Sequence, residues 1–280
     1  MEIAGTGGGP SYADLDRPPL LSRALSTAAV QVPPWRELHV LSEVSSTNDV
    51  VAAAARAGEP EGLVVVAESQ SGGRGRLGRE WLSPPRAGLT LSMLLRPAVP
   101  TDRWPWLPLL VGAAAARAVA QRSGLEVRLK WPNDLVIADR KVAGLLVEGV
   151  GEAVVVGIGL NVSTRRDELP RADATSLALE LGTGEAADRA PLLLAILRAI
   201  GPDYLDWVAA DGAADSVASR YRATCSSIGR TVVISLPSGE EVSGEAVDID
   251  GHGRLVVRGP DGVLSSYSAG DVTHAALVPG

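Results

Sequence analysis

Only two of the 26 basic residues in this chain are lysines, Lys130 and Lys141. Arginine fills almost every other cationic position, whatever drives that bias. The two residue types are not equivalent where a compact and flexible ammonium group is required. We therefore expect at least one of the two lysines to take part in the chemistry of this protein.

A second cationic feature is the segment Gly72–Arg79 (GGRGRLGR), which holds four glycines and three arginines in eight residues. Glycine lets the backbone approach a ligand closely and adopt positive φ angles. Arginine offers a rigid fork of donors that suits phosphate or carboxylate groups. The pattern predicts a loop that closes over a polyanion, whereas a mobile surface loop is the alternative that needs no ligand.

Two familiar nucleotide motifs fit this loop poorly. The glycines at 73, 75 and 78 match a dinucleotide fingerprint in form, but that fingerprint must open a helix. The residues that follow, Trp81 to Pro85 (WLSPP), cannot continue as a helix because of the prolines. A Walker A loop is excluded because no Gly-Lys-Ser/Thr follows the glycines.

Three more segments carry polar groups at expected strand boundaries: KWPND (130–134), RKVAG (140–144) and GIGLN (157–161). Glycines inside a strand often mark a bulge or the close approach of a ligand. None of these segments offers a conventional nucleophile. They supply cations, amides and open backbone, which are the groups that phosphoryl or nucleotidyl transfer needs. Trp131 is expected in the core.

Composition excludes several other classes. One cysteine, Cys225, rules out a disulfide within the chain and CxxC metal sites, and three scattered histidines give no support to a zinc site or a Ser-His-Asp triad. The formal net charge of −7 argues against a nucleic-acid-binding surface. No secretory signal is evident, and the apolar run 107–120 is too short to cross a bilayer. We expect a cytoplasmic protein without a membrane segment.

Chemistry of this kind needs a rigid scaffold, and hydrophobic patterning predicts an α+β fold. Residues 1–34 are expected to form a loosely attached arm with a helix near 20–30. Short links between the strands expected from 125 to 162 indicate antiparallel neighbours, with helices on one side of a mixed, largely antiparallel sheet. That argues against a doubly wound fold. The expected strands are 38–41, 63–67, 88–95, 126–130, 134–138, 142–148 and 153–159, and the expected helices are 48–58, 102–122, 192–209 and 213–223.

The pattern changes after Cys225. Short expected strands at 231–236, 241–249, 254–258 and 263–268 alternate with glycine-containing turns, which is typical of a small β-barrel. The sequence thus predicts an arm (1–34), a catalytic domain (35–225) and a C-terminal β domain (226–280).

Together these motifs resemble those of biotin–protein ligases. Ser46-Thr47-Asn48, GRGRLGR (73–79), KWPND, RKVAG and GIGLN occur in that family's order and spacing. The resemblance covers roughly residues 35–275. It implies a catalytic domain related to class II aminoacyl-tRNA synthetases and lipoate ligases, followed by an SH3-like β-barrel. It also implies two half-reactions, in which biotin is first adenylated by ATP and then transferred to a lysine of a carrier protein.

The resemblance assigns roles residue by residue. Lys141 would contact the carboxylate and the α-phosphate, and Lys130 and Asp134 would lie near the site. We hypothesise that Asp134 helps to receive the carrier lysine. The implied catalytic set is Lys141, Arg76, Arg79 and Asp134. The implied biotin-binding set is Ser46, Thr47, Asn48, Gln70, Gly73, Arg74, Gly75, Arg76, Lys141 and Gly144. The implied ATP-binding set is Arg76, Arg79, Trp81, Lys130, Asn133, Gly157, Gly159 and Asn161.

The resemblance also implies partners. ATP and biotin would be substrates, Mg²⁺ is expected with ATP although no carboxylate cluster marks its ligands, and a biotin carboxyl carrier domain of acyl-CoA carboxylase would be the acceptor. Bifunctional family members carry an N-terminal helix-turn-helix, for which the chain has no room before Trp35, so no specific DNA binding is expected. A lipoate–protein ligase and a non-catalytic biotin-binding module remain the alternatives.

Overall fold

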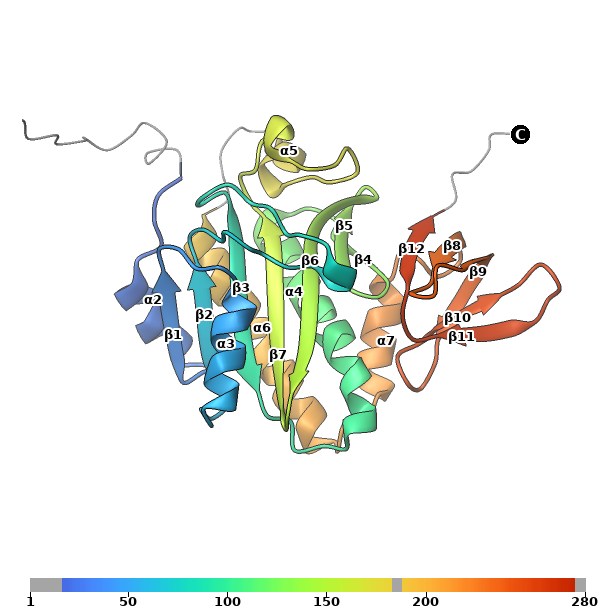
Figure 1. The fold of residues 1–280 in the computed structure, drawn as a ribbon, viewed down its shortest axis with the longest axis horizontal. Coiled ribbons are helices and arrows are strands. Elements are labelled where there is room, and N and C mark those ends of the chain that lie inside the picture. The colour runs from blue at the N-terminus through green and yellow to red at the C-terminus, as the bar shows by residue number, and fades with distance from the viewer. Residues whose placement is uncertain (1–16, 183–187, 275–280) are drawn as a thin grey trace, which may run out of the picture.

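Two β-sheets organise the computed structural model, which describes residues 17–182 and 188–274 (Figure 1). The first sheet has seven strands in the order β1-β2-β3-β7-β6-β5-β4. β1 and β2 are parallel, and every other neighbouring pair is antiparallel. The predicted α+β class with a mixed, largely antiparallel sheet is confirmed. The strands are β1 (Glu37–Leu41), β2 (Leu63–Ala67), β3 (Gly88–Leu95), β4 (Arg128–Lys130), β5 (Asp134–Ile137), β6 (Arg140–Val150) and β7 (Ala153–Asn161).

Helices cover both faces of this sheet (Figure 1). α4 (Leu107–Ser123) and α6 (Arg189–Ala209) pack on one face, whereas α3 (Thr47–Arg56) packs on the other against β2, β3 and β7. The expectation that helices lie on one side only is therefore wrong. All eight residues of β3 are buried, as a strand covered on both faces requires. Because side chains alternate along a strand, Leu94 joins the small cluster under α3 while its neighbours Met93 and Leu95 join the main core.

The remaining helices refine the sequence prediction. The helix expected at 102–122 is two elements, a 3₁₀ turn over Thr101–Trp106 and then α4. Proline lacks the backbone donor that an α-helix needs, so Pro105 accounts for the break. α4 ends at Gly124, whose φ of 73° is a left-handed cap. α2 (Ser22–Ala29) and α7 (Asp215–Thr224) are confirmed, and α5 (Leu177–Leu181) was not expected.

The N-terminal segment is packed more tightly than expected. Leu25 and Ala29 of α2 are buried, and the side chain of Ser26 donates a hydrogen bond to the Leu38 carbonyl. Arg189 donates to the Pro18 carbonyl at 2.6 Å. Residues 17–34 are thus part of the first sheet's core rather than a loose arm, because their apolar face fits against β1 and α6. Residues 1–16 of the predicted arm lie outside the described residues.

The C-terminal strands form a second, five-stranded antiparallel sheet in the order β11-β10-β9-β8-β12. Strand β12 was not expected, because its four residues form a strand only by pairing with β8. No pairing joins β11 to β12 among the described strands, so the predicted β domain is present as a five-stranded antiparallel sheet and the described strands do not close into a barrel. The strands are β8 (Thr231–Ser235), β9 (Glu241–Ile249), β10 (Leu255–Arg258), β11 (Leu264–Tyr267) and β12 (Asp271–His274).

Buried indoles join the two sheets. Trp131 is 2% exposed and donates to the Gly253 carbonyl at 3.1 Å, and Trp106 donates to the Gly251 carbonyl at 2.9 Å. Both tryptophans come from the first sheet's part of the chain, and both acceptors lie in the turn between β9 and β10. The expectation that Trp131 belongs to the core is confirmed.

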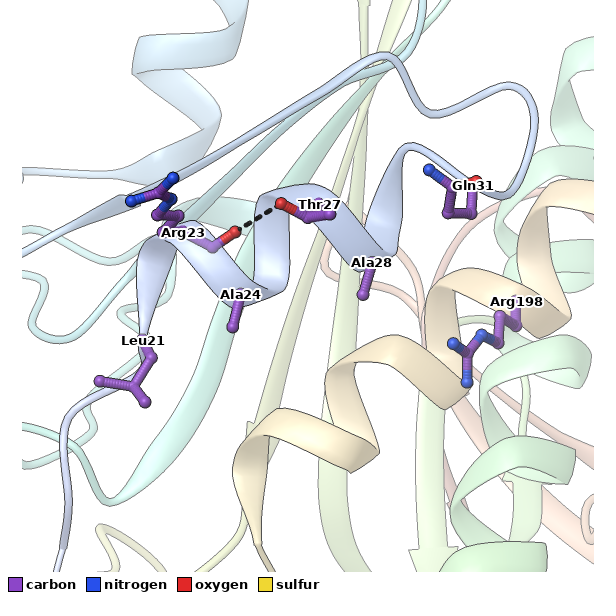
Figure 2. Close-up of a pocket in the computed structure, with 7 residues that line it drawn as sticks. All are labelled: Leu21, Arg23, Ala24, Thr27, Ala28, Gln31 and Arg198. Atoms are coloured by element: carbon purple, nitrogen blue, oxygen red, sulfur yellow. Dashed lines mark hydrogen bonds between the residues drawn. The ribbon is translucent and has the colours of Figure 1, made fainter.

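A groove between α2 and α6 lies outside this junction (Figure 2). It contains none of the residues that the sequence assigned to chemistry. Its lining is Leu21, Arg23, Ala24, Thr27, Ala28, Gln31 and Arg198.

Candidate functional site

The floor of the candidate site is the part of the first sheet where glycines replace side chains, on the same face as α3. Gly159 of β7 lies opposite Gly144 of β6 and Thr90 of β3. Two residues along β7, Gly157 lies opposite Ser92. Residues two apart share one face of a strand, so these positions form adjacent rows with open backbone between them. A flat molecule can lie directly on such a floor.

A cavity of about 420 Å³ stands on this floor. The structure brings together 17 of the 18 residues that the sequence singled out, although they come from segments more than a hundred residues apart. These are Ser46, Thr47, Asn48, Gln70, Arg74, Gly75, Arg76, Arg79, Trp81, Lys130, Asn133, Asp134, Lys141, Gly144, Gly157, Gly159 and Asn161.

Gly73 is the one predicted residue outside the lining. A Cβ at this position would lie 2.4 Å from the Trp81 carbonyl oxygen and 2.8 Å from Nε2 of Gln70. The Gly73 carbonyl also accepts a hydrogen bond from the Trp81 amide at 2.8 Å. Gly73 is therefore needed where the two ends of the loop meet.

Hydrogen-bonded polar residues line one end of the cavity, where α3 begins. Oε1 of Gln70 accepts from the Thr47 amide at 2.8 Å and lies 3.0 Å from the Thr47 hydroxyl. The Ser92 hydroxyl lies 2.7 Å from Oγ1 of Thr47 and 2.6 Å from Oδ1 of Asn48. The side chains of Thr47, Asn48 and Ser92 are almost fully buried, and Ser46 beside them is 3% exposed. This end of the cavity can recognise a compact polar ring.

The indole of Trp81 lies on the open backbone of the floor. A Cβ at Gly159 would be 2.3 Å from Cε2 of Trp81, so only glycine leaves room for the ring. Nζ of Lys141 lies 5.9 Å from the indole centroid, within the range of a cation–π contact. Gly144 leaves room for both side chains, because a Cβ at this position would be 3.0 Å from Lys141 Nζ and 3.4 Å from the indole. Gly144, Gly159, the Trp81 indole and the Lys141 ammonium thus form one packed unit.

Lys141 and Asp134 form the ion pair at the centre of the cavity. Nζ of Lys141 lies 2.7 Å from Oδ1 of Asp134, and their side chains are 34% and 21% exposed. The pair spans the neighbouring strands β5 and β6. The ammonium therefore stays open to the cavity on its other side, where an anion can approach it.

The arginines of the predicted loop point in different directions. Arg74 forms ion pairs with Asp49 at 2.6 Å and with Glu148 at 3.3 Å. Arg79 reaches the second sheet and pairs with Asp271 at 2.5 Å. The loop is thus held at both ends by carboxylates, one set beside α3 and the other on β12.

Arg76 points into the junction between the two sheets. Its Nη1 donates to Oδ1 of Asn133 at 3.0 Å and to the Gly270 carbonyl at 3.5 Å. Burial lowers the pKa of the Arg76 guanidinium, and the charges of Asp271 and Asp134 oppose that shift. A half-buried guanidinium remains charged, and its partial removal from water strengthens any contact with an incoming phosphate.

Asn133 and Asn161, both predicted to bind the nucleotide, already use their amide donors on the backbone. Nδ2 of Asn133 donates to the Leu145 carbonyl at 2.7 Å, and Nδ2 of Asn161 donates to the Thr175 carbonyl at 3.0 Å. Each side chain therefore fixes a loop at the cavity rim. Their direct contact with a nucleotide stays a prediction.

Lys130 faces the carboxylates at the far end of the cavity. The hydrogen bond from Arg230 lowers the pKa of Asp139, and the charge of Lys130 adds to that effect. The hydrogen bond from Arg171 likewise lowers the pKa of Asp173, again with a contribution from Lys130. This end is rich in charges of both signs.

Sequence reasoning missed several residues that line the cavity or hold its parts in place. Thr90 and Ser92 alternate along β3, so their period of two could have indicated that both face the floor. The others carried no local signal because their place depends on tertiary contacts. They are Glu148, Arg171, Asp173 and Asp271.

No membrane-crossing helix occurs within residues 17–182 and 188–274. In the same part of the chain, no three His, Cys, Asp or Glu side chains gather in a way that would hold a metal ion.

Two family models match the chain. The model of the biotin/lipoate A/B protein ligase family matches residues 40–164, and that of the biotin protein ligase C-terminal domain matches residues 227–274. The first match contains the whole floor of the cavity, and the second contains the second sheet.

Relatives and solved structures agree with these matches. A biotin–[acetyl-CoA-carboxylase] ligase of Mycobacterium tuberculosis is 40% identical over 264 residues, which are 92% of this chain and 97% of the relative. The bifunctional ligase/repressor BirA of Escherichia coli is 32% identical over 84% of this chain and 73% of its own length. A biotin protein ligase from Aquifex aeolicus in complex with biotin and ATP superposes with a TM-score of 0.74 at 27% identity, over 86% of this chain and 100% of that structure.

Proposed function

This chain belongs to the biotin protein ligase family, and on that premise we propose how its residues adenylate biotin and transfer it to a lysine of a biotin carboxyl carrier domain. ATP and biotin are the substrates of the first half-reaction. The biotin carboxylate attacks the α-phosphate, which gives biotinyl-5′-AMP and pyrophosphate. In the second half-reaction, the amine of the carrier lysine attacks the acyl carbon and AMP leaves.

The Lys141–Asp134 pair on the glycine floor is the observation that carries this assignment. The polar end of the cavity at Thr47 suits a compact ring with hydrogen-bonding groups, and the charged end near Lys130 suits a nucleotide. Lys141 lies between these ends. It is therefore where the carboxylate of an acid bound at one end meets the α-phosphate of a nucleotide bound at the other.

Lys141 supports the first half-reaction by placing one ammonium between two anions. Carboxylate and phosphate repel each other, and a cation held between them offsets that repulsion as the bond forms. The strand pairing of β5 with β6 and the ion pair with Asp134 fix the ammonium before the substrates arrive. Such preorganisation reduces the reorganisation needed at the moment of reaction.

The loop arginines complete the phosphate site. Arg76 and Arg79 now contact Asn133 and Asp271, and both guanidiniums line the cavity. We assign them to the phosphates, which compete with Asp271 for Arg79. The loop then closes over the mixed anhydride and keeps water away from it.

Asp134 is assigned to the second half-reaction. Its carboxylate is held at the reacting centre by Lys141. When the phosphate engages Lys141, the carboxylate becomes free to orient the ammonium of the carrier lysine and to take up its proton. A positioned general base of this kind acts within hydrogen-bond distance of the proton it removes.

Mg²⁺ fits this site when it is bound mainly by the phosphates of ATP, and it would not need a full set of protein ligands. Mg²⁺ commonly binds substrate phosphates with one or two carboxylates and several waters. Asp134, Asp139, Asp173 and Asp271 line the cavity as candidate carboxylates. When bound, the ion neutralises the phosphates.

Pyrophosphate release tests the function against both alternatives. With ATP present, we expect release with biotin, none with lipoate, and transfer of biotin to a purified carrier domain. Release with lipoate instead would identify a lipoate ligase. Biotin binding without any release would identify a non-catalytic module, which has no use for the phosphate-facing cations.

The absence of specific DNA binding and the cytoplasmic location stay predictions. The first is supported by the net charge of −7. A gel shift that resists rising salt would contradict it, since non-specific phosphate contacts weaken steeply with salt.

A further inference from the structure

Glu148 stands behind the polar end of the cavity. Its Oε2 lies 2.7 Å from Nδ2 of Asn48 and 3.3 Å from Nη2 of Arg74. Glu148 lies on β6 in the row next to that of Leu146, and it is 32% exposed at the side chain. It touches none of the predicted reacting groups directly. Its contact with Asn48 is the feature that links it to the ligand end of the cavity.

The Glu148 carboxylate at 2.7 Å, with the more distant Leu146 carbonyl at 3.5 Å, accepts from Nδ2 of Asn48 and so fixes which way the amide faces. A carboxylate accepts hydrogen bonds and donates none, so the NH₂ group of Asn48 must face Glu148. Oδ1 of Asn48 then faces Ser92, whose hydroxyl lies 2.6 Å away. Gly157 makes this position possible, because a Cβ there would be 2.2 Å from Oδ1 of Asn48.

The amide orientation in turn decides where the single Ser92 proton goes. Ser92 is fully buried and lies between two acceptors, Oδ1 of Asn48 and Oγ1 of Thr47 at 2.7 Å. One hydroxyl has only one proton to donate. When Asn48 presents an oxygen, Ser92 donates to it and leaves the lone pairs of Thr47 unused. If the amide turned over, Ser92 would donate to Thr47 instead.

We propose that Glu148 is a positioning residue for the acid substrate, because it orients the Asn48 amide and so keeps a lone pair on Thr47 Oγ1 ready for a ring N–H. This inference rests on the proposed function. The ureido ring of biotin has N–H donors, whereas the dithiolane ring of lipoate has none. The chain of hydrogen bonds from Glu148 to Thr47 thus favours the ring that can donate.

A simpler explanation is that Glu148 only anchors the loop through Arg74. Asp49 offers a matched control, because it binds the same guanidinium more closely, at 2.6 Å, and has no hydrogen bond to Asn48 within the described contacts. Loss of the loop anchor should affect Asp49→Asn and Glu148→Met alike. Loss of the amide orientation should affect only the second.

The experiment measures biotin binding by calorimetry, together with KM and kcat for pyrophosphate release, in the full chain. For Glu148→Met we expect the biotin Kd and KM to rise about tenfold, with kcat changed by less than about threefold. For Asp49→Asn we expect the biotin Kd to stay within about twofold of the parent value. Circular dichroism confirms that each variant is folded.

An exchange variant tests the orientation itself. In Asn48→Asp/Glu148→Gln the amide at 148 donates to the carboxylate at 48, which still accepts from Ser92. We expect this pair to recover biotin affinity to within about threefold, whereas Asn48→Asp alone, with two carboxylates face to face, should not. Unchanged biotin affinity in Glu148→Met, an equal loss in Asp49→Asn, or no recovery in a folded exchange variant would each overturn the inference. If the parent protein itself bound no biotin, the proposed function would fail instead.

Discussion

The ammonium of Lys141 lies 2.7 Å from the carboxylate of Asp134 and 5.9 Å from the centre of the Trp81 indole. These three side chains come from β6, β5 and the loop after residue 73, and they meet over Gly144 and Gly159. A carboxylate and an aromatic face both stabilise a cation. One carboxylate and one aromatic face thus hold the ammonium in place, and its remaining side stays open to an incoming anion.

Removal of this cation tests its role in bond formation. We expect Lys141→Met to lower the rate of biotin adenylation about 10²- to 10³-fold, as loss of one preorganised electrostatic group commonly does. Single-turnover formation of biotinyl-AMP measures this step alone. The exposed Arg128→Met variant is the control and should react normally. A Lys141→Met enzyme that forms biotinyl-AMP at the parent rate would remove the basis of the mechanism.

The packing of Trp81 on the floor gives a second prediction. Gly159→Ala places a methyl group where the indole lies, so the ring and its loop must shift. We expect kcat/KM for ATP to fall about tenfold and stability to fall by about 1–3 kcal/mol. Adding Trp81→Ala removes the clash, so the stability losses of the two changes should not add up. Fully additive losses would show that the indole does not occupy this position.

The loop's attachment to the second sheet can be tested by proteolysis. Asp271→Asn removes the charge that holds Arg79, so trypsin should cleave after the loop arginines faster than in the parent protein. Biotin with ATP should restore protection, because the ligands bind the same loop. Asp248→Asn serves as the control, because it removes a carboxylate from another exposed arginine ion pair, Arg222–Asp248. Equal cleavage with and without ligands would argue against loop closure.

His274 predicts a pH dependence of stability. Burial lowers the pKa of His274 to about 4, and the charges of Lys130 and Arg230 add to this shift. The ordinary value for histidine is about 6.5, so between those values the unfolded chain binds the extra proton and the folded chain does not. Stability should therefore be fully present above about pH 6.5 and decline as the pH falls toward 4.

The measurement is urea unfolding at several pH values. The parent protein should lose about 2 kcal/mol or more over this range from His274, and a folded His274→Gln variant should show a correspondingly smaller slope. Equal slopes in the two proteins would contradict the assignment.

The attachment of the N-terminal segment depends on a buried ion pair. Arg189 and Glu68 are 6% and 10% exposed at the side chain, and their polar atoms are 2.6 Å apart. The Glu68 carboxylate also accepts a hydrogen bond from the Leu20 amide. Arg189→Met leaves this buried carboxylate without its cationic partner and should destabilise the protein by about 3–5 kcal/mol. The exposed pair Arg128–Glu126 is the control, and its loss should cost below about 1 kcal/mol. Similar losses from both variants in urea unfolding would contradict the prediction.

Strands with strong local patterning were predictable from sequence. β2 and β3 match the expected ranges, because continuous runs of mostly apolar residues carry their own signal. α5 and β12 were missed since each is only four or five residues long and is stabilised by contacts from distant segments. The N-terminal segment was misjudged for the same reason, because its partners Glu68 and Arg189 lie far along the chain.

The amino-acid sequence by itself determined the chemistry available to this protein: two lysines, an arginine-rich glycine loop, and glycines spaced two apart in strands. Those features depend on residue type and local spacing, which the chain states directly. Only the tertiary structure decided which groups meet. The pairing of β3, β7 and β6 sets the glycines side by side, brings Trp81 onto them, and places Glu148 behind Asn48. Such contacts arise from sheet register and from packing of α3, and no local pattern in the chain records them.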